Sequence, residues 1–308
     1  MSKLNLSVCL LALNEAQHIG KALKSVKSWA QEIIVVIDDL TTDNTAQLAK
    51  KYTDKVYKQK HYDNFHINKQ YALNKATQPW ILWLDADEKI TKNLKLEIER
   101  KVKKEKNPYN GYFIPRKNII FNKWIRYTGW YPDHQLRLFK NGQVKFPCQR
   151  IHEHPQVNPP LGYLKNPLIH YNYQTVTQFV EKMNRYTSTD AKNFAKEFQP
   201  PYYQHFITRP INEFIKRFLV WHGYKDGLHG LALSFLQAAY ELTVVTKAWE
   251  INHFSKEKPV HFTEVTEKEA KNILKNWFWW KKQLQIEQTQ NPFKKVGLKI
   301  LRRLKSLF

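Results

Sequence analysis

Residues Trp80 to Glu88 read Trp-Ile-Leu-Trp-Leu-Asp-Ala-Asp-Glu, and this stretch decides the fold of the N-terminal half. Its first five residues are apolar without a break, which is the pattern and length of a fully buried strand. Asp85 and Asp87 follow at once. Because ligands bind at the carboxyl ends of strands in open α/β sheets, the stretch predicts two acids at a ligand site, suited to Mg²⁺ or Mn²⁺. Taken alone, Asp-x-Asp is a weak signal and also fits solvated acids in a turn.

Strands and helices alternate around this stretch. Apolar or β-branched runs predict strands at 6–13, 32–37 and 55–57, and helical spacing predicts helices at 16–29 and 65–76. Such alternation implies parallel strands in a doubly wound α/β sheet.

Two of these strands also end in polar residues. Asn14-Glu15 follows the first strand, and Asp38-Asp39 follows the second. Because the carboxyl ends of parallel strands share one edge of the sheet, we expect these residues to lie on the same edge as Asp85.

The character of the sequence changes after Asp87. The pattern predicts an amphipathic helix at 94–102 and strands at 111–115, 119–125 and 135–139, the last ending in the hairpin signal Asn141-Gly142. From about residue 176 the sequence is largely helical. We therefore divide the chain into a first domain, residues 1–190, and a helical region, residues 191–308.

Composition limits the function classes. The chain has 308 residues with 42% hydrophobic residues, enough for a sizeable core. Its nine glycines form no G-x-G-x-x-G or Walker-type loop. A net charge of +23 favours an anionic partner, such as nucleic acid, acidic phospholipid or a phosphorylated substrate. The two cysteines predict free thiols in a reducing cytosol. The N-terminus does not have the pattern of a signal peptide. No membrane-spanning helix is expected.

The polar strand ends belong to an ordered set of motifs. The set comprises residues 7–15, 35–45, 68–73, 84–88, 129–139 and 151–153. In order and spacing it resembles the family 2 glycosyltransferases, in particular the branch of lipopolysaccharide core glycosyltransferases. The resemblance covers roughly the first 190 residues, and the segments 223–227 and 247–250 extend it into the helical region.

The resemblance implies a GT-A fold, a nucleotide-sugar donor, a divalent metal (Mg or Mn) and inversion at the anomeric carbon. It implies that Asp87 binds the metal directly and that Asp85 contacts the ribose or binds the metal through water. The residues implied to hold the nucleotide are Asn14, Glu15, Asp38, its neighbour Asp39, and Lys69, which would neutralise diphosphate charge. The chain departs from the family pattern at Leu40, where a glycine is usual.

The resemblance also names a base. Asp133 matches the acid that deprotonates the acceptor, and its neighbours Trp130 and Tyr131 predict stacking on a sugar and a raised carboxyl pKa. Arg137 is expected to bind a phosphate or to support Asp133. His152 stands where related enzymes complete the metal site, although a structural role fits it equally well. His154 and His170 are interpreted as structural.

The C-terminal sequence predicts contact with a membrane surface. Residues 231–249 predict a buried or interfacial helix, and the aromatic run 277–280 suits either a lipid interface or a packed helix. In residues 293–308 an apolar stripe, with Leu298 off it, faces six basic residues. A basic amphipathic helix is typical of an anchor on an anionic membrane, and docking on the protein is the alternative.

These features together predict an inverting glycosyltransferase at the cytoplasmic face of the inner membrane. It would move a hexose, with UDP-glucose as the expected donor, to a lipid-linked glycan such as lipopolysaccharide core. A metal-dependent nucleotidyltransferase is the alternative, but it would usually carry a Gly-rich basic loop where Asn14-Glu15 stands. A nucleic-acid-binding protein fits less well, because the basic charge is spread while the acids gather at strand ends.

Overall fold

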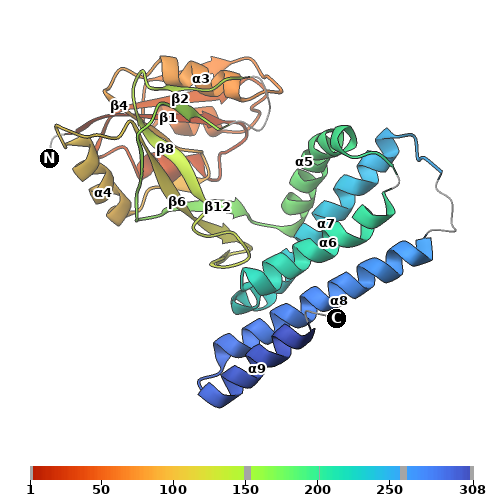
Figure 1. The fold of residues 1–308 in the computed structure, drawn as a ribbon. Helices are drawn as coiled ribbons and strands as arrows, with labels where there is room; N and C mark the ends of the chain where they lie inside the picture. Colours follow the sequence, from red (N-terminus) through yellow and green to blue (C-terminus); the bar gives the residue numbers. More distant parts are fainter. Residues whose placement is uncertain (1–2, 149–153, 201, 257–261, 306–308) are drawn as a thin grey trace. The chain divides into compact units, whose positions relative to one another are not determined.

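The chain divides into two compact units in a computed structural model (Figure 1). The structure describes residues 3–148, 154–200, 202–256 and 262–305. The sheet unit comprises residues 1–120 and 131–172, and the helical unit comprises residues 121–130 and 173–308.

The sheet unit begins with the predicted alternation of strands and helices. Its elements are β1 (Leu4–Ala12), α1 (Ile19–Lys24), β2 (Ala30–Asp38), α2 (Thr45–Lys50), β3 (Val56–Gln59), α3 (His66–Asn74), β4 (Trp80–Trp83), β5 (Glu88–Lys89), α4 (Lys92–Val102), β6 (Gly111–Ile120), β8 (His134–Lys140), β9 (Val144–Lys145), β10 (Gln156–Val157), β11 (Leu161–Tyr163) and β12 (Leu168–Tyr173).

The strand order is β3-β2-β1-β4-β8-β6-β12-β5, with β11 beside β6. β1 runs parallel to both β2 and β4, whereas β8 runs antiparallel to β4, with Leu82 opposite Leu138. The carboxyl ends of β1, β2 and β4 therefore meet the first residues of β8 at one edge. This topology confirms the doubly wound, mostly parallel sheet with an antiparallel part, the arrangement expected of a GT-A fold.

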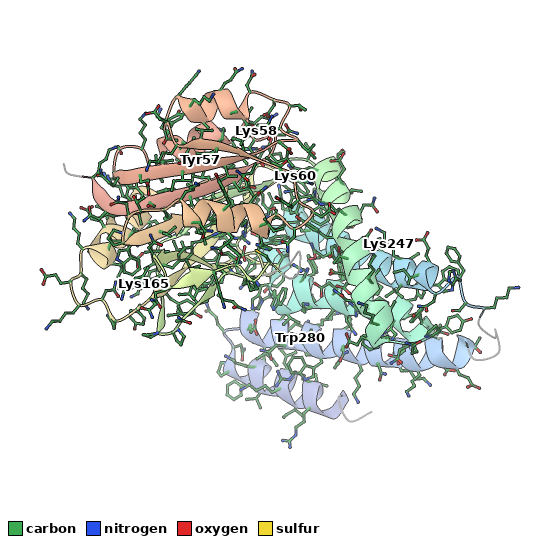
Figure 2. All side chains as sticks on the ribbon, turned by 90° about the horizontal axis from the view of Figure 1, so that it is seen from above. Tyr57, Lys58, Lys60, Lys165, Lys247 and Trp280 are labelled. Atoms are coloured by element: carbon green, nitrogen blue, oxygen red, sulfur yellow. The ribbon has the colours of Figure 1, made fainter. Side chains whose placement is uncertain are left out.

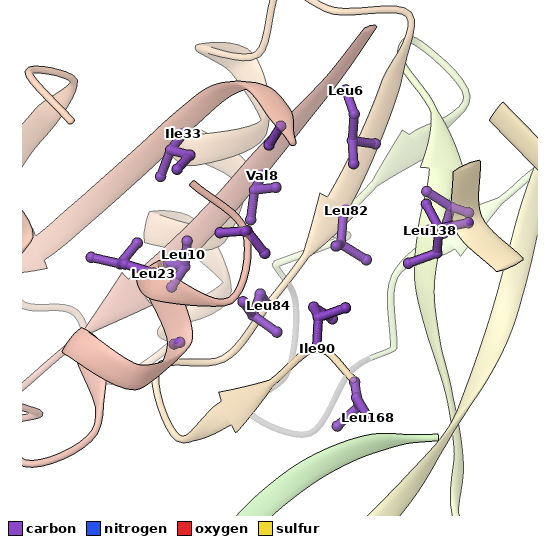
Figure 3. Packing of buried hydrophobic residues seen from close by; sticks show 14 of the residues in the cluster. Leu6, Val8, Leu10, Leu23, Ile33, Leu82, Leu84, Ile90, Leu138 and Leu168 are labelled. Atoms are coloured by element: carbon purple, nitrogen blue, oxygen red, sulfur yellow. The ribbon is translucent and has the colours of Figure 1, made fainter. Parts of the chain in front are cut away.

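Both faces of the sheet are buried. Val8 and Leu10 of β1 pack with Leu23 of α1 and Leu82 of β4 on one face (Figure 3), while the intervening Cys9 belongs to the core that includes Ala72 of α3 on the other. Residues 80–84 are each at most 6% exposed. Strands buried on two sides read as continuous apolar runs, which is why the stretch lacks alternation.

Three local predictions were wrong in detail. The turn at Asn141-Gly142 forms, with Gly142 at φ +78°, but β9 pairs with β10 instead of returning along β8, so there is no hairpin. The predicted strand 119–125 is interrupted, because Phe121 and Asn122 have positive φ. The helix predicted at 16–29 is shortened to α1, and the residues on either side form turns in which bonds to the third preceding residue, such as Val26 N–H to Leu23 O, mix with helical ones.

The helical unit contains α5 (Val176–Glu197), α6 (Tyr203–Ile215), a π-helix (Lys216–Val220), a 3₁₀-helix (Gly223–Asp226), α7 (Leu228–Ile251), α8 (Phe262–Gln288) and α9 (Pro292–Lys305), together with the short β7 (Lys123–Trp124). α5 and α6 pack on α7 around an apolar cluster that includes Phe194 and Val245. Lys247 of α7, labelled in Figure 2, donates to the backbone and side-chain oxygens of Asn184 on α5.

α7 is the one helix in the described ranges with enough length and apolar character to cross a membrane, judged by those two properties alone. Two of its charged residues have partners inside the unit. Glu241 accepts a hydrogen bond from Arg209 Nε at 2.8 Å, and Lys247 Nζ lies 2.7 Å from Asn184 Oδ1. These contacts attach α7 to α6 and α5, whereas the expectation of no helix able to span a membrane is not met by length and apolar character alone.

Candidate active site

Asp85 lies in a cluster of opposite charges just past β4. Its carboxylate accepts hydrogen bonds from Arg137 Nη2 and from Trp83 Nε1, the latter at 2.8 Å. Lys69 Nζ lies 3.7 Å from Asp85 Oδ1. Arg137 Nη2 also donates to Glu88 Oε1 at 2.8 Å. Burial works to raise the pKa of Asp85, but the positive charges of Arg137 and Lys69 outweigh it and hold that pKa far below its usual range. Asp85 is therefore a fixed carboxylate at neutral pH.

Lys69 is not an ordinary exposed helix lysine. Its ammonium lies 5.0 Å from the ring centres of Phe65 and Trp83, and burial lowers its pKa. It borders a pocket of about 310 Å³ that also contains Asp85, Arg116 and Arg137. Three cationic side chains around one pocket are suited to an anionic ligand.

Asp133 is held by donors on both carboxylate oxygens. Its Oδ2 accepts from Arg116 Nη2 at 2.7 Å and from Asn118 Nδ2 at 2.9 Å, and its Oδ1 accepts from Gln135 Nε2 at 3.0 Å. The expected rise in pKa was wrong. Burial does raise the pKa of Asp133, but Arg116 and the amide donors lower it by more, so the net shift is downward. The aromatic neighbours in the sequence gave no sign of these donors.

Asp87 lies next to His170 of β12. His170 Nε2 is 3.3 Å from Asp87 Oδ2, and His170 Nδ1 is 2.6 Å from Asn118 Oδ1. Because the Asn118 amide nitrogen donates to Asp133, its oxygen faces His170, so Nδ1 must be the protonated ring nitrogen. Nε2 is therefore the ring nitrogen that faces a carboxylate oxygen of Asp87.

This arrangement fits a divalent metal. His170 Nε2 and a carboxylate oxygen of Asp87 lie close enough to share one ion, and a metal-binding histidine usually has its other N–H held by an oxygen, as here. Within the described ranges no three His, Cys, Asp or Glu side chains gather closely enough to hold a metal by themselves. Two protein ligands suit Mg²⁺, which commonly takes its remaining ligands from water and substrate phosphates.

Ion pairs and hydrogen bonds join these residues into one network. Arg116 Nη1 lies 3.8 Å from Glu88 Oε1, which links the Asp85 cluster to Asp133, and Asn118 and His170 continue the network to Asp87. The expected support of Asp133 by Arg137 was wrong: Arg137 pairs with Asp85 and Glu88, and Arg116 holds Asp133.

The residues after β1 and β2 form a second group on the same edge. Asn14, at φ +54°, accepts the backbone N–H of Thr42 at 2.9 Å and so joins the two strand ends. Asp38 is buried and lies 2.9 Å from His61 Nδ1, whereas Asp39 is exposed and accepts the backbone N–H of His61 at 2.8 Å.

Glu15 also lies in this second group. Its backbone N–H donates to Thr45 at 2.7 Å, and its carboxylate lies 3.1 Å from His18.

Of the two neighbouring histidines in the motif at 151–154, only one is described. His152 lies outside the described residues. His154 borders the pocket beside Asp85.

Sequence reasoning missed three residues of the network: Arg116, Asn118 and His170. Arg116 and Asn118 stand two residues apart in β6, and Asn118 is fully buried between Lys117 and Ile119. The polar run from Arg116 to Asn118 inside an otherwise apolar strand was the available signal, because a buried polar residue needs a partner. His170 alternates with apolar positions in β12, where it was interpreted as structural.

Residues 7–155 match the model of glycosyl transferase family 2. A lipopolysaccharide core biosynthesis glycosyltransferase, LpsC of Rhizobium meliloti (strain 1021), is 25% identical over 83% of this chain and 96% of its own length. An uncharacterized glycosyltransferase of Rickettsia felis is 28% identical over 76% of this chain and 85% of its own length. The crystal structure of S. aureus TarS 1-349 in complex with UDP is 13% identical, with a TM-score of 0.41 over 83% of this chain and 93% of that one.

The match of the family domain covers the strand ends after β1, β2 and β4 and the segment that carries Asp133. The ordered motifs, the sheet topology and this match agree. The chain belongs to glycosyltransferase family 2 and is a glycosyltransferase.

Proposed function

We propose that this glycosyltransferase inverts the anomeric carbon as it transfers a hexose, from UDP-glucose or a similar UDP-hexose, to a lipid-linked glycan such as lipopolysaccharide core. One observation carries the proposal: a single network joins Asp85 and Asp87 to Asp133. A donor-binding acid pair and a separate base are the two parts that an inverting transfer needs. The relationship to LpsC supports the acceptor class.

On the donor side, Asn14, Glu15, Asp38 and Asp39 line the nucleoside site in this proposal. The Asp38 carboxylate accepts an N–H of the base, and the fixed turn after β1 shapes the site around it. Lys69 approaches the diphosphate, which carries growing negative charge as the sugar leaves.

Asp87 and His170 would hold a divalent metal, and Asp85 would contact it through water or bind the ribose. Such a metal, Mg²⁺ or Mn²⁺, stabilises the charge of the leaving diphosphate when bound. Arg137 and Lys69 keep the Asp85 carboxylate ionised, and Glu88 helps to orient the Arg137 guanidinium. His152 stays a prediction as a further ligand.

Asp133 removes the proton from the acceptor hydroxyl. Its lowered pKa keeps it ionised at neutral pH, as a base must be before it accepts a proton. Oδ1 accepts one hydrogen bond, from Gln135, which leaves a lone pair for the hydroxyl, while Arg116 and Asn118 anchor Oδ2. Attack from the side opposite the diphosphate inverts the anomeric carbon.

We propose that residues 1–190 perform catalysis and that the helical region 191–308 holds the enzyme at the cytoplasmic face of the membrane. On α9, Phe293, Val296, Ile300 and Leu301 are 86%, 56%, 54% and 48% exposed. The off-stripe residue Leu298 is only 8% exposed, and Arg302 lies over the ring of Trp279 on α8. Because α9 packs on α8 and leaves its apolar stripe uncovered, the stripe and its basic residues suit an anionic lipid surface.

A panel of nucleotide sugars tests the reaction class. We expect the protein to release UDP from a UDP-hexose in the presence of Mn²⁺ or Mg²⁺ and to stop when EDTA is added, because the leaving diphosphate needs its charge stabilised. Chromatography of the products distinguishes the alternatives. With pyrophosphate added, formation of UTP and hexose 1-phosphate from the UDP-hexose in place of UDP would support a nucleotidyltransferase, and no binding or turnover of any nucleotide sugar would refute the proposal.

Vesicle sedimentation tests the membrane surface. We expect the full chain to sediment with vesicles containing phosphatidylglycerol and the double variant Phe293→Ser, Ile300→Ser to bind them about tenfold or more weakly, because both exposed side chains lose apolar area. Leu96→Ser, at an apolar residue of α4 that is 48% exposed, is the control and should bind as wild type. Equal sedimentation of the double variant and wild type would show that the apolar stripe of α9 is not the membrane anchor.

A further inference from the structure

Tyr163, the last residue of β11, is an exposed aromatic side chain held by other rings of the sheet unit. It is 62% exposed, although the ring of Phe113 on β6 is stacked on it, with ring centres 4.9 Å apart and an angle of 18° between the planes. The ring of His134 on β8 meets it at 89°, with the centres 5.1 Å apart. These contacts fix the orientation of the Tyr163 ring and leave more than half of the residue open to a ligand.

The backbone beneath Tyr163 is also held in place. β11 pairs in parallel with β6, with Tyr163 opposite Phe113, and the backbone N–H of Leu164 donates to the carbonyl of Phe113 at 2.8 Å. A Cβ at Gly162 would lie 2.7 Å from the ring of Tyr112, which is only 2% exposed and cannot move aside. Position 162 therefore requires glycine for β11 to pass this close. A ring that is fixed before binding loses little conformational entropy when a ligand is bound.

The sheet topology places Tyr163 and the donor-binding residues on opposite sides of Asp133. The strand order β2-β1-β4-β8-β6, with β11 beside β6, puts the start of β8 between the ends of β1, β2 and β4 and the rings on β6 and β11. β8 is antiparallel to both β4 and β6, and β11 is parallel to β6. Tyr163 at the end of β11 thus lies toward the same edge of the sheet as Asp85.

Local contacts join these rings to the candidate base. His134 directly follows Asp133, whose Oδ2 accepts from Arg116 Nη2 at 2.7 Å. Phe113 packs in the same apolar core as Leu136, and Leu136 lines the pocket beside Asp85 together with Arg116. We name the rings of Tyr163, Phe113 and His134 the acceptor platform. An inverting transfer needs the acceptor hydroxyl at the base, on the side away from the leaving diphosphate, and the platform lies on that side.

We propose that Tyr163 binds the sugar that receives the hexose, by stacking on its ring and so presenting a hydroxyl to Asp133. A pyranose carries C–H groups on the faces of its ring and hydroxyls around its rim. An aromatic ring offers an apolar face for the former, and the tyrosine hydroxyl is a polar tip that stays in contact with water. The substrate class is thus a glycan whose accepting residue has an uncovered C–H face. This inference rests on the proposed function, because Asp133 must act as the base.

The test compares Tyr163→Thr with Tyr163→Phe, using a deacylated lipopolysaccharide core oligosaccharide as the acceptor with UDP-glucose and Mn²⁺. Threonine suits a strand but removes the ring. We expect Tyr163→Thr to raise KM for the oligosaccharide about tenfold or more, with kcat within about threefold of wild type. Its release of UDP from UDP-glucose without acceptor should match wild type. Tyr163→Phe keeps the ring and should retain the wild-type KM.

Leu96→Ala, at an apolar residue of α4 that is 48% exposed, is the control and should match wild type in every quantity. An unchanged KM in Tyr163→Thr would overturn the proposal. An equal loss of acceptor-free UDP release would also overturn it, because Tyr163 would then act on the donor. Equal defects in Tyr163→Thr and Tyr163→Phe would assign the effect to the hydroxyl and exclude stacking.

Calorimetric titration with the same oligosaccharide separates this inference from the proposed function. If wild type releases no UDP from any nucleotide sugar, the proposed function fails. The platform still predicts that wild type binds the oligosaccharide and that Tyr163→Thr binds it about tenfold or more weakly. Absence of binding by wild type, or equal binding by the two proteins, would overturn the platform whatever the turnover.

Discussion

Replacing Asp87 by Ala should reduce the metal-dependent release of UDP from UDP-glucose by about a thousandfold and abolish the contribution of Mn²⁺ to UDP binding. The carboxylate of Asp87 lies 3.3 Å from His170 Nε2, and the other nitrogen of that ring is held by Asn118. Without Asp87, a bound metal would lose the carboxylate that suits it best and would keep only the imidazole of His170. Release of UDP with Mn²⁺ and with EDTA, for variant and wild type, measures the effect.

Asp54→Ala is the matched control for this variant. Asp54 is exposed and precedes β3, at the edge of the sheet opposite the candidate site, so its loss should leave turnover and metal dependence unchanged. If Asp87→Ala turned over donor at the wild-type rate, or kept the same response to Mn²⁺, Asp87 would not hold the metal.

Replacing Asp133 by Asn should leave donor binding intact and slow turnover by about 10²- to 10⁴-fold, the usual contribution of a general base. An amide has nearly the shape of the carboxylate but cannot take the proton of an acceptor hydroxyl. The residues around UDP in the proposal, including Asp85 and Asp87, are unchanged. Single-turnover kinetics together with UDP titration separates the two quantities.

The corresponding control is Asp54→Asn, the same chemical change away from the site. It should leave both quantities as in wild type. A variant Asp133→Asn that transferred sugar at the wild-type rate would exclude Asp133 as the base. One that lost UDP binding in proportion to turnover would place Asp133 in the donor site instead.

The sequence predicted the parts of the site that depend on local pattern. Residues 80–84 are continuous and apolar because β4 is buried on both faces, and Asp38 and Asp85 stand at the carboxyl ends of β2 and β4, the two parallel strands that flank β1, as expected. Strand alternation and strand ends follow from short-range order, so they can be read along the chain.

The contacts that give each acid its properties depend on long-range register. Arg116 and Asn118 reach Asp133 because β6 lies beside β8, with Pro115 opposite His134. His170 reaches Asp87 from β12, more than eighty positions along the chain. No local sequence pattern predicts these contacts between distant strands. This is why support of Asp133 was offered as one of two roles for Arg137, which instead pairs with Asp85 and Glu88, and why the pKa of Asp133 was expected to shift in the wrong direction.

The packing of the C-terminal helix α9 is a second feature that the sequence did not determine. The amphipathic pattern of α9 predicts an apolar stripe, and the stripe exists. The side of α9 that packs on α8 is the one that carries Leu298, since Leu298 is buried while Phe293 and Ile300 are exposed. The sequence alone left docking and membrane contact open, and the exposure of the stripe favours the membrane proposal.

Titration calorimetry of UDP in the presence of Mn²⁺ tests the central claim most directly, using wild type, Asp87→Ala and Asp133→Asn. A metal–donor site at Asp87 and a separate base at Asp133 predict that Asp133→Asn binds UDP as wild type does and that Asp87→Ala loses the Mn²⁺-dependent part of the affinity. Wild-type binding by Asp87→Ala, or loss of binding by Asp133→Asn, would contradict this division of roles.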